Sequence, residues 1–392
     1  MGFLFTQKKE KTIDIFDIGS GSVGGATVSV PVDDKKFPTI IKSVRSEINF
    51  KENHDFNSLM KEITKALEIS SNSLFHKKGG SPEKIVCVLT SPLYISETRI
   101  IKMKNANSFI FTQKLADRLI EKEISNFTEL NKDKYNNIKS TPEIIERHVV
   151  SVLLDNHIEN NPLNKQCKSF EISVVISLAP KLCLDRIKEV LSKTFYNQNI
   201  TFSSFTFDSY LAVRDRYIQP NSYLLVDIAG EVTDIGVVTD GILKSFLSFP
   251  FGRKNFLKYI CNELRIELRD AKELLRLYND GNLSVSFNNK LVPVLELIND
   301  SWGKAFDQCL STLPSSFIIP NIVFLTTDDD IKDWFINTLN NKKYLQSQTP
   351  IDKYIVASLD GSLFLDMCNI SEGVCDNFLM IEAIAATRKI NI

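Results

Sequence analysis

Two glycine-containing segments hold the residues whose types and spacing could do chemistry. The first reads Asp17-Ile-Gly-Ser-Gly-Ser22 and the second reads Asp227-Ile-Ala-Gly-Glu-Val-Thr-Asp234, each at the end of an apolar run. A turn of this kind presents backbone N–H groups to an anion, and glycine lets the backbone approach phosphate oxygens closely. Asp17 and Asp227 would orient the water ligands of a magnesium ion. We therefore predict phosphate binding by Gly19, Ser20, Gly21, Ser22, Gly230, Glu231 and Thr233.

The first segment also fits a second phosphate-binding pattern. Gly19, Gly21 and Gly24 match the dinucleotide fingerprint G-x-G-x-x-G, in which the glycine turn opens a helix. Here residues 26–30 have the composition of a strand, so we predict a strand–turn–strand hairpin instead. A hairpin turn without a ligand is the alternative for either segment alone. The presence of two such segments favours a pair of phosphate loops that face each other across a cleft.

The elements that position the two segments recur in a similar order, which predicts a duplicated α/β fold. The first half comprises residues 12–93 and 170–220, and the second half comprises residues 221–392. Each half opens with a glycine-turned hairpin. Residues 1–11 are predicted to be a flexible N-terminus, in which Gly2 and Thr6 fit the loose N-myristoylation pattern.

Residues 94–169 interrupt this order and are predicted to form an inserted α+β subdomain. The patterns indicate a helix over 113–127, a polar connection over 131–140 and an extended segment over 147–154. A strand over 170–177 is then expected to resume the sheet of the first half.

Composition excludes several classes of protein. The 392 residues include 47 Lys and Arg against 48 Asp and Glu, so the net charge of −1 gives no reason to expect nucleic-acid binding. Seven scattered cysteines and four separated histidines indicate neither a disulfide framework nor a zinc site, and are typical of a cytoplasmic protein. No apolar run has the length of a membrane span.

The two glycine segments resemble the phosphate loops of the actin-like ATPase superfamily, and the order of the chain resembles its FtsA and PilM branch. The branch resemblance also rests on the insertion in the first half and on the segments Asn161-Pro-Leu163, Ser204–Ala212 and Phe251–Phe256. It implies two actin-like (ribonuclease H-like) α/β halves with an inserted subdomain of the FtsA or SHS2 type. It also implies ATP and Mg²⁺ as ligands, with adenosine contacts from Lys272, Leu275, Thr326, Thr327 and Asp328.

Several departures from the family pattern predict a degenerate nucleotide site with at most weak ATPase activity. Ala229 and Glu231 stand where the family has glycine, and Thr327 and Asp328 replace the adenosine-motif glycines. A carboxylate ~5 Å from a phosphate oxygen costs roughly 3 kcal/mol at an effective dielectric constant of ~20. Any nucleotide binding is therefore expected to be weak and magnesium-dependent.

The resemblance favours a cytoplasmic scaffold of the FtsA type that links a division filament to the membrane. The alternative is a PilM-like type IV pilus assembly protein that binds the cytoplasmic tail of an inner-membrane partner. The chain length favours FtsA, whereas the tail after Ala386 leaves no room for an amphipathic membrane helix, which favours PilM. Self-association and peripheral membrane contact, through the partner or the N-terminus, are also expected. The inserted subdomain is expected to contact partners through its edge strands.

Three further patterns have competing interpretations. An actin-fold sugar or acetate kinase is a third possibility, with Asp208 or Asp234 as general base. The acidic run 328–330 could bind a divalent metal, but acids that begin a helix are more often a solvated N-terminus. Trp302 and Trp334 fall on helical patterns and are interpreted as core residues.

Overall fold

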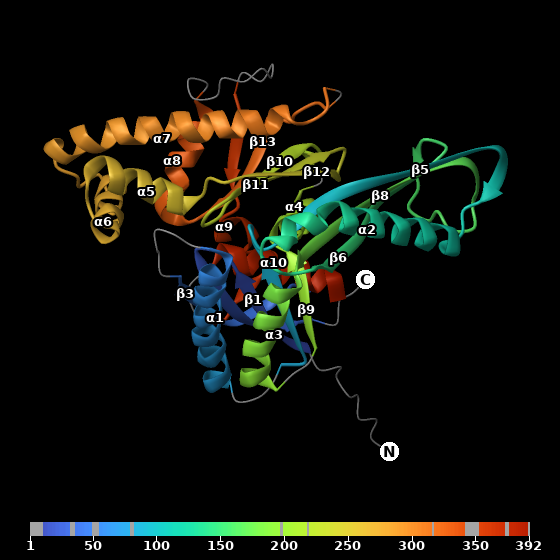
Figure 1. The fold of residues 1–392 in the computed structure, drawn as a ribbon, viewed down its shortest axis with the longest axis horizontal. Helices are drawn as coiled ribbons and strands as arrows, with labels where there is room; N and C mark the ends of the chain where they lie inside the picture. The colour runs from blue at the N-terminus through green and yellow to red at the C-terminus, as the bar shows by residue number, and fades with distance from the viewer. Residues whose placement is uncertain are drawn as a thin grey trace. The chain divides into compact units, whose positions relative to one another are not determined.

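The chain folds into two compact units, drawn in Figure 1. The computed structural model describes residues 11–31, 36–48, 55–78, 82–196, 199–217, 219–315, 317–341, 353–372 and 376–390. The predicted N-myristoylation pattern, and all of the predicted N-terminus except Lys11, lie outside these residues. Unit 1 contains residues 1–90, 181–217 and 360–392, and unit 2 contains residues 91–180 and 218–359.

The sheet of unit 1 is built around the first glycine hairpin. Its strand order is β15-β3-β2-β1-β4-β9. The first two strands are antiparallel and Ile18 lies opposite Val23, which confirms the predicted strand–turn–strand and excludes the dinucleotide fingerprint. The six strands are β1 (Lys11–Ile18), β2 (Ser22–Val30), β3 (Thr39–Glu47), β4 (Lys84–Leu89), β9 (Ile200–Ser204) and β15 (Asn369–Ile370).

Two pairs of helices cover the two faces of this sheet. Successive side chains of a strand point to opposite faces. Phe16 packs against Phe195 of α3, with ring centroids 5.9 Å apart, so this face carries α1 and α3. Asp17 points the other way, toward α10, which packs beside α4. The helices are α1 (Phe56–Lys78), α3 (Lys181–Phe195), α4 (Phe205–Arg216), the short α9 (Gly361–Phe364) and α10 (Asn377–Ile390).

Unit 2 contains a second sheet with the same connectivity. Its order is β12-β11-β10-β13-β14, which repeats the order β3-β2-β1-β4-β9 of unit 1 strand for strand. In both sheets a hairpin pairs antiparallel and its first strand pairs parallel with a later strand. The predicted duplication is therefore confirmed. The strands are β10 (Tyr223–Ile228), β11 (Thr233–Thr239), β12 (Ile242–Phe249), β13 (Ile322–Thr327) and β14 (Ile355–Ser358).

Four helices enclose an aromatic core against this second sheet. Trp302 is fully buried and stacks on Phe306, and Trp334 meets Phe256 edge to face, as expected for core residues. The long helix begins at Val285 and carries Pro293 in its interior. The helices are α5 (Arg253–Leu264), α6 (Leu268–Asn279), α7 (Val285–Ser311) and α8 (Asp329–Asn340).

The inserted subdomain is a four-stranded antiparallel sheet with one helix, in the order β5-β8-β6-β7. Its helix continues to Asn136, into the stretch 131–140 that was predicted as a polar connection, because Tyr135 is buried and donates a hydrogen bond to the Leu178 carbonyl. The elements are β5 (Ile95–Ile110), α2 (Gln113–Asn136), β6 (Pro142–Leu154), β7 (His157–Ile158) and β8 (Gln166–Pro180).

Two boundaries differ from the sequence prediction. The strand predicted over 170–177 belongs to β8, which pairs with β5 and β6 in the inserted sheet rather than with the first half. Its apolar run is buried on both sides and would suit either sheet. Residues 360–392 were assigned to the second half, but α10 packs on β1, β2 and α4 in unit 1. In the part of the chain that the structure describes, no helix has the length and hydrophobicity needed to cross a membrane.

Candidate functional site

The first glycine loop is held by its own backbone. The Gly19 N–H donates to the Ser22 carbonyl at 3.1 Å, and the Gly21 carbonyl accepts from the Ile48 N–H at 2.9 Å. A Cβ at Gly19 would lie only 3.0 Å from Thr90 Oγ1, so a larger residue here would require Thr90 to shift. The hydroxyls of Ser20 and Thr90 are buried and have no hydrogen-bond partner among the described residues. The loop thus keeps the geometry that the sequence predicted.

The carboxylate predicted to order a magnesium ion is instead paired with an arginine. Asp17 is only 3% exposed, and its Oδ2 lies 2.7 Å from Nη1 of Arg45 on β3. The same Nη1 donates to Ser22 Oγ at 2.8 Å. On its other side the guanidinium forms two hydrogen bonds with Asp376, of 2.6 and 2.9 Å, and lies over the Phe378 ring. Arg45 therefore links the first loop to the beginning of α10.

The strand register explains how Arg45 reaches Asp17 across the strand between them. Asp17 lies opposite Gly24 in the β1–β2 ladder, and Gly24 lies opposite Arg45 in the β2–β3 ladder. A Cβ at Gly24 would lie 2.7 Å from Arg45 Nη2. Because glycine has no side chain, the guanidinium can cross the middle strand. Sequence reasoning missed Arg45, and this glycine opposite it was the available signal.

A buried acidic cluster surrounds this ion pair. Glu382 of α10 is fully buried, and neither of its carboxylate oxygens has a hydrogen-bond partner among the described residues. Burial, with added repulsion from Asp17 and Asp208, raises the pKa of Glu382 well above its usual value. Asp208 pairs with Lys389 and accepts from Ser203 Oγ at 3.1 Å. Asp208, proposed above as a kinase base, is thus enclosed and paired.

These contacts do not fit a magnesium-bound nucleotide at Asp17. A carboxylate that orders the waters of Mg²⁺ must face the ion, whereas Asp17 Oδ2 faces a guanidinium that is itself fixed by Asp376. Metal binding through Oδ2 would require Arg45 to leave this carboxylate.

The second glycine loop covers the beginning of α5. The carbonyls of Ala229 and Gly230 accept from the N–H groups of Arg253 and Lys254 at 2.9 and 2.8 Å. A Cβ at Gly252 would lie 2.4 Å from the Ala229 carbonyl oxygen, so only glycine permits this contact. The first N–H groups of the helix, which often bind anions, are therefore used within the unit.

Glu231 in this loop has its own cation. Its Oε1 lies 3.0 Å from Lys254 Nζ, so its charge is offset. Arg253 instead forms hydrogen bonds of 2.9 and 3.0 Å with Asp330, and lies 3.5 Å from Asp328. The acidic run therefore begins α8 and pairs with an arginine. No group of three or more potential metal ligands occurs within the described residues.

Several other predicted ligand residues serve the core. Thr233 is fully buried, donates to the Phe251 carbonyl at 2.5 Å and accepts from Trp302 Nε1 at 3.2 Å. Leu275 is part of the hydrophobic core, and Thr326 is buried. Thr327 Oγ1 donates to the Ile228 carbonyl at 3.3 Å. The two remaining predicted adenosine contacts are Lys272, which is half-buried on α6, and Asp328, which directly precedes α8.

Two aspartates face each other across the second hairpin. Asp227 is the next-to-last residue of β10 and lies opposite Asp234 of β11, and both are buried. Asp234 accepts hydrogen bonds from Ser91 Oγ at 2.8 Å and from the Tyr94 hydroxyl at 3.4 Å. Burial raises the pKa of Asp234 to about 6, against the opposing effect of these hydrogen bonds. As with Asp208, this enclosure does not suit a kinase base that must reach a substrate.

The duplicated sheets with their glycine-turned hairpins define an actin-like ATPase fold. The solved "PilM-PilN type IV pilus biogenesis complex" is similar, with a TM-score of 0.59 and 12% identity over 98% of this chain and 99% of that chain.

Two other solved structures give lower scores. EutJ, an ethanolamine utilization protein from Carboxydothermus hydrogenoformans, has a TM-score of 0.46 and 8% identity over 97% of this chain and 90% of that one. A Bacteroides thetaiotaomicron protein with an actin-like ATPase fold and unknown function has a TM-score of 0.39 and 12% identity over 98% and 99%. No protein-family model matches the chain, and no curated protein matches it. At these identities the likeness concerns the fold alone.

Proposed function

We propose that this protein is an assembly scaffold of the PilM kind, which binds a segment of a partner protein and does not work by nucleotide turnover. The observation that carries the proposal is the pairing of Asp17 with Arg45, because it occupies the carboxylate that a magnesium–nucleotide complex would use. A protein that keeps the fold without this function is free to act through its surfaces.

The class of partner comes from the similar solved structure, which is a PilM–PilN complex of type IV pilus biogenesis. We propose a membrane-anchored partner with a cytoplasmic segment, which places this chain on the cytoplasmic face of the membrane. The FtsA-type role, in which the chain links a division filament to the membrane, has no structural observation that favours it over this one. A kinase role is disfavoured because Asp208 and Asp234 are both buried.

Two measurements test the proposal. Isothermal titration calorimetry of the full chain with Mg·ATP and Mg·ADP should show no binding at micromolar ligand, and micromolar magnesium-dependent binding would contradict the proposal. In cells that make the protein naturally, a tagged copy should co-purify with a membrane protein. A synthetic peptide of that protein's cytoplasmic segment should then bind the purified chain. Co-purification with soluble metabolic enzymes alone would also contradict it.

A further inference from the structure

One edge of the inserted sheet is open along most of its length. β6 pairs with β8 on one side over its full length, but on the other side β7 pairs only with Leu153 and Leu154. From Pro142 to Ser151 that second edge has no strand partner within the described part of the chain. An unpaired edge presents a row of backbone donors and acceptors to any extended chain.

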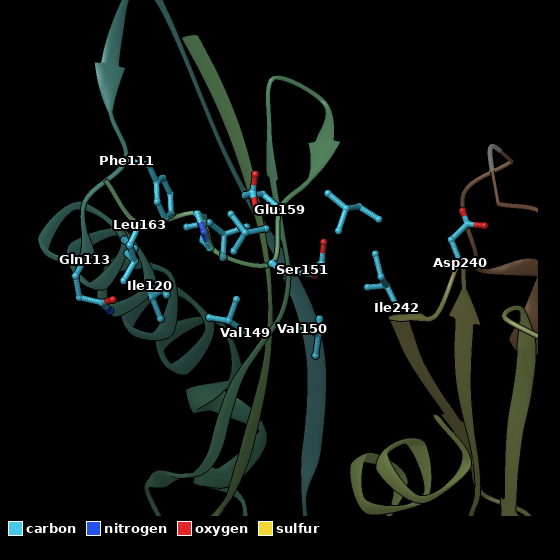
Figure 2. Close-up of a pocket in the computed structure, with 16 residues that line it drawn as sticks. Phe111, Gln113, Ile120, Val149, Val150, Ser151, Glu159, Leu163, Asp240 and Ile242 are labelled. Carbon is cyan, nitrogen blue, oxygen red and sulfur yellow. The ribbon is translucent and has the colours of Figure 1, made fainter. Parts of the chain in front are cut away.

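A cavity of about 500 Å³ lies at the end of this open edge that is formed by residues 149–152. It lies where the chain leaves the sheet after β7, between β6, α2, the segment 158–163 and the β11–β12 turn. Figure 2 shows Val149 and Ile120 on one side of β6, and Val150, Ser151 and Ile242 on the other. Residues 149–152 of β6 all line the cavity. The register of β6 against β8 shifts between Val149 and Ser151, and such a bulge interrupts the regular alternation of side chains, so the cavity includes neighbouring residues of this strand.

The cavity is lined by apolar side chains that are unusually exposed. Val149 is 50% exposed, Ile158 is 62% exposed and Leu163 is 46% exposed, and all three line it. Contiguous exposed apolar groups of this kind mark interaction sites more often than ordinary surface.

A buried hydroxyl in the same cavity has no partner. Ser151 is 8% exposed, lines the cavity, and its Oγ has no hydrogen-bond partner among the described residues. A buried polar atom left unsatisfied costs free energy, which a ligand with a donor or acceptor would recover if the Ser151 side chain turns toward it.

The charges around the cavity select one kind of ligand. Its lining includes two carboxylates, Glu159 and Asp240, and no lysine or arginine. Glu159 is paired with Lys165 at 2.7 Å, whereas Asp240 is exposed and no ion pair is recorded for it among the described residues. An apolar ligand with a positive charge therefore fits better than an anionic one.

We propose that this edge binds an extended segment of a partner protein, in which apolar side chains alternate with at least one basic residue. The segment pairs through its main chain with β6, places apolar side chains against Val149, Ile158 and Leu163, and sets its basic residue near Asp240. Strands rise ~3.3 Å per residue, so a segment of about six residues spans roughly 20 Å, less than the open part of β6. The inference deepens the proposed function by assigning its partner site.

The test selects peptides on the full-length protein. A phage-displayed library of random twelve-residue peptides is selected on the immobilised chain, and enriched peptides are synthesised with fluorescein for anisotropy titrations. We expect enriched sequences with apolar residues at alternate positions and with lysine or arginine. Hydrogen–deuterium exchange should show added protection in residues 143–151 when such a peptide binds.

Three variants locate the binding. Val149→Lys removes an apolar contact and adds a positive charge, which repels the basic residue of the peptide. It should weaken binding by about tenfold or more, which corresponds to ~1.4 kcal/mol. Ser151→Ala removes the unpartnered hydroxyl, so it should weaken binding several-fold without lowering the melting temperature. Leu130→Lys, on an exposed part of α2 outside the cavity, is the matched control and should bind as the wild type does.

The outcomes separate this inference from the proposed function. If no peptide is enriched, or if enriched peptides bind Val149→Lys as tightly as the wild type, the inference is overturned. The proposed function is decided separately, by the nucleotide titration and by co-purification of the membrane partner. A partner segment that binds with the variants unchanged would therefore keep the function and reject this site.

Discussion

Removing the Arg45 charge should strongly destabilise unit 1. Arg45→Met keeps the apolar stem but leaves Asp17, which is 3% exposed, without its cation. Breaking a buried ion pair by removing one partner typically costs 3–5 kcal/mol. Because the Arg45 side chain is 26% exposed, we expect the lower end, about 3 kcal/mol. Urea unfolding followed by circular dichroism at neutral pH measures this loss.

A double-mutant cycle with Asp17→Asn isolates the pair. The double variant should be more stable than the sum of the two single losses predicts, by about 2 kcal/mol, because the second change removes the charge that the first one stranded. The pair between Lys193 and Glu189 on α3, at 2.6 Å with both side chains largely exposed, is the control in the same unit. Lys193→Met should leave the urea midpoint unchanged. If Arg45→Met has an equally small effect, the pairing has no structural role.

The same geometry predicts that the loss of stability caused by a substitution at Gly24 depends on which residue stands at position 45. A Cβ at Gly24 would lie 2.7 Å from Nη2, so Gly24→Ala should displace the guanidinium and destabilise the wild type. In the Arg45→Met background this contact no longer exists, and Gly24→Ala should cost much less. Equal losses of unfolding free energy in the two backgrounds would refute the argument that Gly24 exists to let Arg45 reach Asp17.

Three further outcomes follow from the second unit. The pKa of Asp234 is raised to about 6 in the folded chain, so its contribution to stability is present below pH ~4 and is lost as the pH rises to ~6. The free energy of unfolding should therefore fall by about 3 kcal/mol over this range, and Asp234→Asn should remove this fall in urea titrations at several pH values. Thr233→Val strands the Phe251 carbonyl and should cost about 1–3 kcal/mol in the same assay, whereas Thr233→Ser should cost less. Glu231→Gly should not create Mg·ATP binding by calorimetry, because Lys254 already offsets that charge; new binding would show that Glu231 blocks the site.

Local signals in the sequence were sufficient for much of the fold. The hairpins around Gly19 and Gly230 follow from glycine turns between short β-branched runs. The strand at 170–177 was assigned to the wrong sheet because a run buried on both faces does not indicate its neighbours. The extension of α2 past Asn131 depends on tertiary contacts of Tyr135, which override the polar composition.

The candidate site was predicted less completely, for a related reason. Residue type and spacing identified Asp17 and Glu231, but not the cations that neutralise them. Arg45 is 28 positions beyond Asp17 in the sequence, and only the register of two strand ladders brings them together. For Glu231, the turn of α5 brings Lys254 to it, whereas the adjacent Arg253 pairs with Asp330. Such pairings depend on side-chain direction, which sequence spacing alone does not fix.

Three glycines in or beside the two predicted loops, one of which was predicted to bind phosphate, have a structural explanation within their own unit. Gly19 makes room for Thr90, Gly24 for Arg45, and Gly252 for the Ala229 carbonyl. The actin-like hairpins can therefore keep their glycines for packing whether or not a nucleotide binds, and the motif by itself does not separate the two cases. By contrast, the open edge of β6 and its exposed apolar neighbours have no comparable role in the fold. The exposed apolar groups beside β6 are therefore the observation that motivates the proposed partner site.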